Sequence, residues 1–389
     1  MKKLFIFIAA ATIVAACAKS QESAPEASPI SFAPNALSTK VLILPDDNAD
    51  EQNAFPTTES FNVFAFAALD GSTYNYTTPL MDDVNISNQG GDWKATTGTY
   101  LWPATGVVDF YAYYPGTLDA TFVSDEDPKG INLTGISLGT AIGSQIDPLV
   151  ATALAQMSSS KPKVNLVFKH IASQIAVTAF DATTTETLKG KISIEKVTFK
   201  NMHTSGDYTK STTIGKGQWS NINTTANFVS FEGSEVLEET ESFLSGASFT
   251  AAIDNSAAFV VIPDNVVTGT AADQVIEVKY SIAAYTINGF DYPATPTQTV
   301  NIPLYGRVSA NKFQNGKRYV FHIGISLDGA NNEIMFSPEV VGWETENISG
   351  ITIDAINHEL IQQHENRLFI IDLRSGRGNP VPSGSKIEK

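Results

Sequence analysis

Alternation of apolar and polar residues in many short segments is the feature that most constrains this chain. Val164, Leu166 and Phe168 lie on one face of an alternating segment, and residues 276–282 and 319–327 follow the same period of two. In a β-strand this period puts one face on a core and the other in water. Helical periodicity is scarce elsewhere, so the sequence predicts an all-β protein.

The length of the chain, 389 residues, fits two domains at about 100–200 residues per domain. Short strands separated by turn residues are typical of β-sandwiches. We therefore expect two tandem sandwiches, at residues 41–182 and 183–343, followed by a C-terminal extension at residues 344–389. Residues 145–158 are the best candidate for a connecting helix or an extended loop.

A change of phase between residues 192–194 and 197–199 predicts a β-bulge in one strand of the second sandwich. The runs at residues 61–69 and 107–114 are almost continuously apolar, which is typical of strands buried on both faces.

Composition excludes several classes of protein. The chain has 25 Lys and Arg against 41 Asp and Glu, a formal charge of −16, which argues against binding to nucleic acid. No apolar run reaches the roughly 18 residues that span a bilayer as a helix. A single Cys excludes a disulfide framework and a thiolate metal cluster.

The N-terminus has the features of a secretory signal. Lys2 and Lys3 precede a short apolar stretch, and small residues then lead to Cys17. The ending at residues 14–17 resembles the bacterial lipobox, in which the peptide is cut before the Cys and the thiol carries lipid. We expect residues 1–16 to be a lipoprotein signal peptide and Cys17 to be the lipid attachment site. An ordinary signal peptide with a chance Cys is the alternative.

The C-terminal extension allows two interpretations. It contains a short strand at residues 351–353, a polar stretch of helical pattern at residues 358–367 and an apolar strand at residues 368–373. One interpretation is an extra edge strand with a disordered end. The other is a strand that is donated to another molecule.

Catalytic and metal-binding motifs are weak. His358, Glu359 and His364 lack the H-E-x-x-H spacing, and residues six apart do not share a helix face. Residues 125–136 only partly match a calcium loop, because Lys129 fills a ligand position. We expect no enzyme activity, no cofactor and no metal. The aromatic residues could stack on sugars but more often fill a core: Trp93, Trp102, Tyr111 and Tyr113.

Several ordered segments together resemble the fimbrillin superfamily of Bacteroidetes, the subunits of type V pili. They are the lipobox with residues 30–32 and 39–40, Trp93 with residues 100–103 and 109–115, residues 166–175, and residues 315–319 leading to residues 341–343. The resemblance implies two transthyretin-like β-sandwich domains, export as an outer-membrane lipoprotein and assembly into a surface fimbrium for adhesion and biofilm formation.

The resemblance also implies polymerisation by strand exchange with other fimbrial subunits. A protease would remove the N-terminal segment of residues 17–40, including a first strand near residues 29–37, and would cut after Lys40. The family's processing site is usually Arg, and the first Arg of this chain is Arg307. The donor strand would come from the C-terminal extension, with these residues as candidates: Ile351, Ile353, Leu368, Ile370 and Leu373.

The position in the filament stays open at this point. The C-terminal extension favours a shaft subunit over a tip, whereas an uncut Lys40 would fit an anchor. The alternative function is a monomeric surface lipoprotein that binds a glycan or another host ligand through exposed aromatic residues.

Overall fold

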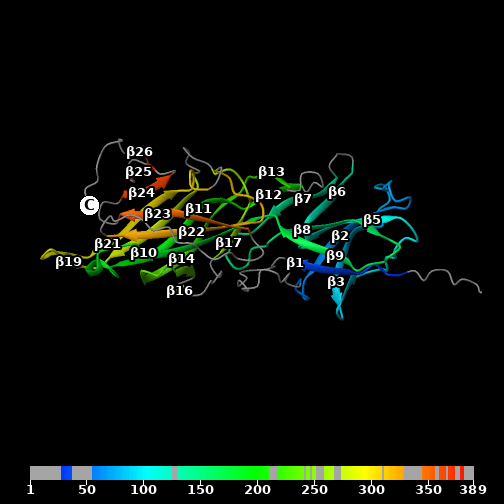
Figure 1. The fold of residues 1–389 in the computed structure, drawn as a ribbon, viewed down its shortest axis with the longest axis horizontal. Helices are drawn as coiled ribbons and strands as arrows, with labels where there is room; N and C mark the ends of the chain where they lie inside the picture. Colours follow the sequence, from blue (N-terminus) through cyan, green and yellow to red (C-terminus); the bar gives the residue numbers. More distant parts are fainter. Residues whose placement is uncertain are drawn as a thin grey trace, which may run out of the picture.

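The computed structural model describes residues 28–36, 55–124, 129–209, 217–240, 242–245, 248–250, 258–266, 273–308, 311–327, 344–354, 359–364, 367–372 and 377–380. These residues form β-strands and a single turn of 3-10 helix, η1 (Glu186–Leu188), which confirms the all-β prediction. No helix in this part of the chain is long and apolar enough to cross a membrane. Figure 1 shows an elongated molecule with the first strands at one end and most later strands at the other.

Seven strands of the first half close into a ring of hydrogen-bonded neighbours. In spatial order they are β1 (Phe32–Ala36), β4 (Asp92–Ala95), β3 (Met81–Gln89), β2 (Ser60–Ala68), β5 (Val107–Tyr114), β8 (Leu149–Met157) and β9 (Val164–His170). The ring closes because β1 pairs with β9 on one side and with β4 on the other.

A second layer explains why β2 and β5 are apolar throughout. It is a bridging sheet of β13 (Gln218–Ser220), β12 (Ser205–Thr209), β7 (Gly130–Ser137) and β6 (Asp119–Val123). Phe61 and Val63 of β2 point into the ring core, whereas Phe64 and Phe66 belong to a separate apolar cluster that includes Leu133 of β7. Both faces of β2 are therefore buried, as the continuous apolar run predicts.

The second half is a sandwich of two sheets. The short sheet contains β14 (Thr225–Val236), β11 (Ile192–His203), β18 (Val275–Ile282) and β21 (Thr295–Pro303). The long sheet contains β16 (Ser248–Thr250), β15 (Ser242–Ser245), β10 (Ser173–Asp181), β22 (Lys317–Ser326), β23 (Glu344–Asp354), β24 (Glu359–His364), β25 (Arg367–Asp372) and β26 (Arg377–Pro380), and β17 (Phe259–Val261) also pairs with β10. The core between the sheets includes Phe199 and Val278 of the short sheet and Phe321 of the long sheet.

The predicted β-bulge is confirmed in β11. Its register against both β14 and β18 shifts between Ile194 and Lys196. The shift lets Ile194 and Val197 both point into the sandwich core.

Two segments that we did not expect to be strands form strands. Residues 145–158, expected to form a helix or a loop, contain β8, which pairs with β5 and β9. Residues 358–367, expected to be helical, contain β24, which pairs with β23 and β25. In both cases pairing with neighbouring strands outweighs local helix propensity.

Sheet pairing places the division between the halves before β10, whereas the sequence pattern places it after residue 182. Residues 173–181, expected in the first sandwich, form β10, which pairs with β22 of the second. The bridging sheet also joins the halves, since β7 pairs with β12. Only Ile171 and Ala172 connect the ring to the long sheet, and both are buried.

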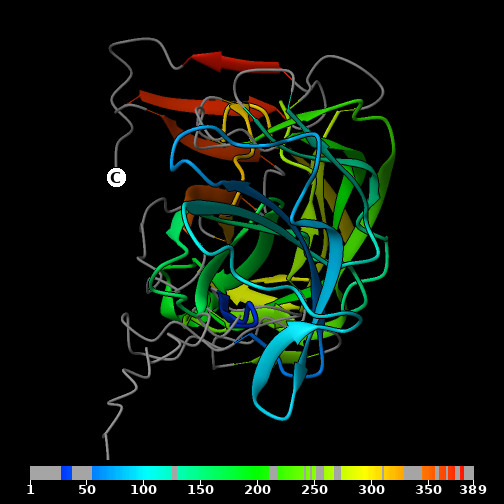
Figure 2. The same ribbon diagram turned by 90° about the vertical axis from the view of Figure 1, so that its right-hand side faces the viewer.

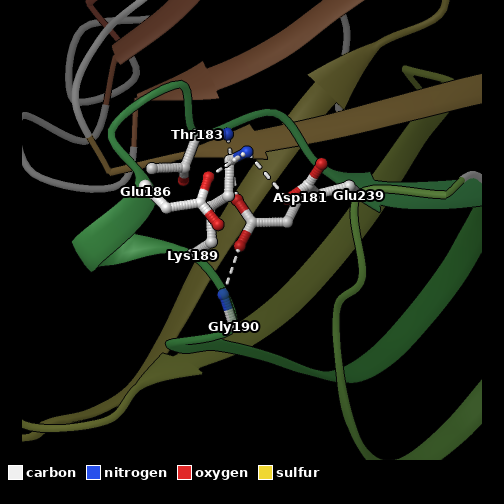
Figure 3. Close-up of polar contacts among 6 residues, drawn as sticks. All are labelled: Asp181, Thr183, Glu186, Lys189, Gly190 and Glu239. Carbon is white, nitrogen blue, oxygen red and sulfur yellow. Dashed lines mark hydrogen bonds and ion pairs between the residues drawn. The ribbon is translucent and has the colours of Figure 1, made fainter.

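A polar loop closes the far end of the second half, where β10 ends (Figure 3). The backbone N–H groups of Thr183 and Gly190 donate to the two carboxylate oxygens of Asp181, at 2.9 and 2.8 Å. Lys189 forms ion pairs with Glu186 and Glu239, at 2.8 and 2.7 Å. These hydrogen bonds raise the pKa of Lys189. Residues 181–190, which include the expected domain boundary at residue 182, thus form a defined loop.

Candidate functional site

The strand β1 is the candidate functional element, because this short N-terminal strand joins β4 to β9 and so closes the ring. It runs parallel to β9, with Phe32 opposite Val164 and Ala36 opposite Phe168, and Phe32 is also paired with Trp93 of β4. The residues just before it are tied to the same region. The Ile30 N–H donates to the Tyr100 carbonyl at 2.8 Å, and the Ser28 carbonyl accepts from Trp102 at 3.0 Å.

Alternate side chains of this segment fill the ring core. Ile30 and Phe32 are 4% and 2% exposed, and Pro34 is also buried. The ring of Phe32 makes edge contacts with Phe61 and Phe110, at centroid distances of 6.0 and 5.7 Å. The intervening residues are half-buried, which is the period-two pattern of a strand that packs on one face.

Phe55, which follows Lys40 in the sequence, covers the same core. It is 1% exposed and contacts the rings of Trp93, Tyr114 and Phe168, at centroid distances of 5.4, 5.4 and 5.1 Å. The Tyr114 hydroxyl donates to Glu59 at 3.1 Å, and burial together with Glu59 raises the pKa of Tyr114. No pattern in the sequence singled out Phe55, since it follows a polar stretch.

Loss of β1 would therefore have two consequences. It would leave the facing edges of β4 and β9 without hydrogen-bond partners, and such edges accept another strand. It would also expose the pockets of Ile30 and Phe32, whose burial stabilises the fold by about 1.5–3 kcal/mol per side chain. The ring is thus built to hold one extended apolar segment at this position.

Three of the predicted site residues lie outside the described residues: Cys17, Lys40 and Leu373. The other four lie in the C-terminal strands. Ile351 and Ile353 lie in β23, opposite Ile323 and Ile325 of β22, while Leu368 and Ile370 lie in β25. The candidate donor segments are therefore paired within their own chain, and β1 and these segments belong to different sheets.

The four aromatic residues considered for sugar stacking are buried. Trp93 and Trp102 belong to the ring core, and Tyr111 and Tyr113 belong to the cluster under the bridging sheet. Their rings are not open to a ligand, so the glycan-binding alternative loses the residues on which it depended.

Ionisable groups of the first half serve the fold. The carboxylate of Asp109 accepts from the Tyr74 hydroxyl at 2.8 Å and from the Ala155 N–H at 2.6 Å. Burial and this carboxylate raise the pKa of Tyr74. Among the described residues, no group of three His, Cys, Asp or Glu side chains could hold a metal ion.

The family match among the comparisons with known proteins agrees with the resemblance. A family model described as fimbrillin-like matches residues 48–343. A fimbrial protein from Bacteroides vulgatus is 15% identical with a TM-score of 0.47, and the match covers 77% of this chain and 96% of that one. A candidate cell adhesion protein from Bacteroides ovatus is 17% identical with a TM-score of 0.44, and covers 82% of this chain and 99% of its own.

No curated protein sequence matches the chain. The family match extends over most of the chain, from before Phe55 to the residue before β23, and leaves β1 and the C-terminal strands outside it. The chain is therefore a structural, non-enzymatic protein, and it belongs to the fimbrillin-like family.

Proposed function

We propose that the chain is the precursor of a cell-surface fimbrial subunit that polymerises by exchanging β1 for a strand of another subunit. The observation that carries the proposal is that a short N-terminal segment, ending at Ala36, completes the ring and fills its core. Such a segment can leave without disturbing the order of the other six strands.

Export and processing follow from the N-terminal sequence. In this proposal Cys17 carries the lipid that holds the precursor at the outer membrane. A protease then cuts after Lys40, which removes β1 and leaves Phe55 in place. Lys40 has the position that Arg holds in the family, so the protease must accept Lys.

The donor comes from the C-terminal extension. Phe369, Ile371 and Leu373 repeat the i, i+2, i+4 spacing of Ile30, Phe32 and Pro34. A donated strand gains main-chain hydrogen bonds from both edges, while alternate side chains fill the pockets. Because the donor segments are paired within their own chain, donation requires that β25 leaves its neighbours. A C-terminal donor favours a shaft subunit over a tip.

Replacement of Lys40 tests this function. Cells that carry Lys40→Ala should lose the ladder of polymers that the wild-type protein forms on SDS gels without boiling. Lys94→Ala, at an exposed position of β4, is the matched control and should keep the ladder. Unchanged polymers in Lys40→Ala would exclude processing at Lys40, and a wild-type chain without polymers would contradict the shaft role.

A further inference from the structure

Most of the exposed large apolar side chains in the described part of the chain lie at the two opposite ends of this elongated molecule (Figure 1), with Val229 and Tyr305 as the exceptions. One end, here called the ring pole, is where β1 begins and β8 ends. It carries Leu69, Leu101, Leu154 and Met157, of which Leu69 and Met157 are 63% and 60% exposed. Register places Met157 opposite Val107, which is itself paired with Ala68, the neighbour of Leu69. Figure 2 views the molecule from this end.

The other end, here called the hairpin pole, is where β10 ends and β11 begins. A two-stranded hairpin of β19 (Tyr285–Ile287) and β20 (Phe290–Tyr292) projects from it, at the far left of Figure 1. Phe290 is 70% exposed and Tyr292 is 43% exposed. Val236, the last residue of β14, is exposed at the same pole, where it is paired with Ser193.

The hairpin is rigid enough to act as a contact finger. Asn288 and Gly289 form its two-residue turn with φ of 53° and 78°, as a type I′ turn requires. The rings of Tyr285 and Tyr292 stack across the strands at a centroid distance of 4.9 Å, and the Thr286 hydroxyl donates to Asp291 at 2.6 Å. Its base is held by the loop that Asp181 organises, since the Ala283 N–H donates to the Lys191 carbonyl at 2.8 Å. A preorganised apolar contact loses little entropy on binding.

The directions of the strands determine which ends of two neighbouring subunits come together. β22 and β23 run parallel to β10, so the C-terminal strands leave β23 at the hairpin pole. β1 runs parallel to β9, so its groove begins at the ring pole. Thirteen residues, which include β24, separate Asp354 from Leu368. When β24 leaves β23 together with β25, an extended chain of that length spans about 43 Å. A donated C-terminal strand therefore brings the hairpin pole of one copy to the ring pole of the next.

We propose that the β19–β20 hairpin of one subunit docks on the apolar surface of Leu69, Leu101, Leu154 and Met157 of the next subunit. The occupant of that surface is a second copy of this chain, and the proposal rests on the strand-exchange function. A head-to-tail contact between unlike surfaces repeats along a filament when its rotation does not close a ring. It gives each junction a second contact, which limits rotation about the donated strand.

Cysteine cross-linking in fimbriae on cells tests the contact. The only Cys of the chain is Cys17, which the proposed processing removes. Any cross-link in the processed subunit therefore comes from the engineered cysteines. The full-length chain with both Phe290→Cys and Met157→Cys, treated with a short bismaleimide, should give a boiling-resistant ladder of subunits. Phe290→Cys with Val229→Cys is the matched control and should give none, because Val229 is exposed in the middle of β14.

The outcomes separate this contact from the strand exchange. A boiling-sensitive ladder without cross-links would overturn the hairpin contact and leave the strand exchange intact. Absence of any polymer in the wild type would overturn both. If cross-links are absent and Phe290→Ser instead lowers adhesion of cells to a glycan-coated surface, the hairpin binds another partner and the proposal is wrong. Thermal melting of each variant checks that the substitutions leave the fold unchanged.

Discussion

Phe32 is the residue that contributes most directly to closing the ring. Its side chain is 2% exposed and contacts two core phenylalanines, so truncation would leave a cavity. In the uncut chain, Phe32→Ala should lower the free energy of unfolding by about 3–5 kcal/mol. Asn35→Ala, which removes a 2.8 Å hydrogen bond to Asn165 at the surface, should cost about 1 kcal/mol or less. Urea unfolding followed by fluorescence of the tryptophans measures both, and equal effects would contradict the assigned role.

His203 of β11 predicts how the stability of the protein depends on pH near neutrality. Burial lowers the pKa of His203, although Asp264 at 3.4 Å partly offsets it. The folded state favours the neutral ring, so the contribution of His203 is complete above its unfolded pKa of about 6.5 and declines as pH falls below it. Above pH 7 the melting temperatures of the wild type and of His203→Gln should change with pH in parallel. Between about pH 5 and 6.5 the melting temperature of the wild type should fall more steeply with decreasing pH than that of His203→Gln. Parallel curves across that window would contradict this.

Asp207 of β12 affects stability at a lower pH than His203 does. Hydrogen bonds from Asn221 and the Gly135 N–H lower the pKa of Asp207, so its contribution is present above about pH 4 and is lost as pH falls below that value. Because Gly135 belongs to β7 and Asp207 to β12, Asp207→Asn should loosen the bridging sheet at neutral pH. Hydrogen exchange of β7 amides measures this, and unchanged protection would be evidence against it.

The sequence predicts some side-chain environments and not others. Alternation correctly identifies Val164, Leu166 and Phe168 as core residues of the ring. It does not reveal that Phe55 belongs with them, because a single aromatic residue outside a strand carries no periodicity. Nor does composition distinguish a buried aromatic cluster from a sugar-stacking surface, since that depends on the second layer over β2 and β5.

At the scale of elements, strands with clean alternation are predictable and strands of mixed composition are not. β9 and β18 alternate as expected. In β22 the core face is as expected, but the other face, which includes His322, is also buried and does not face water. β8 is rich in Ala and Leu, and β24 contains Glu, Leu and Gln, so their local preference is helical. Only pairing with strands that are distant in sequence decides their conformation, and no local pattern contains that information.

The C-terminal strands provide a prediction at this scale. A chain that ends at residue 343 lacks β23 to β26 but keeps the β1 groove, so it should accept a strand and donate none. Alone it should form no polymers, and together with the wild-type chain it should shorten them. A chain that ends at Pro380 keeps every described strand and is the control. Polymers of normal length in the co-expressing cells would contradict the assignment of the donor to residues 344–389.

For the whole molecule, the sequence does not reveal how the two halves are connected. The length and the repeated strand pattern indicate two units, yet β10 belongs to the second and the bridging sheet combines strands of both. The chain passes from the ring to the long sheet at the buried pair Ile171 and Ala172, before the expected boundary at residue 182. The result is an elongated body with the β1 groove beginning at one pole and the C-terminal strands leaving at the other.

Mass spectrometry of subunits extracted from surface polymers tests the central claim, the exchange of β1, most directly. We expect a mature N-terminus at Val41 and no peptide from residues 28–36, because the polymer must have released β1. Polymers whose subunits retain an acylated Cys17 and an intact β1 segment would contradict the account.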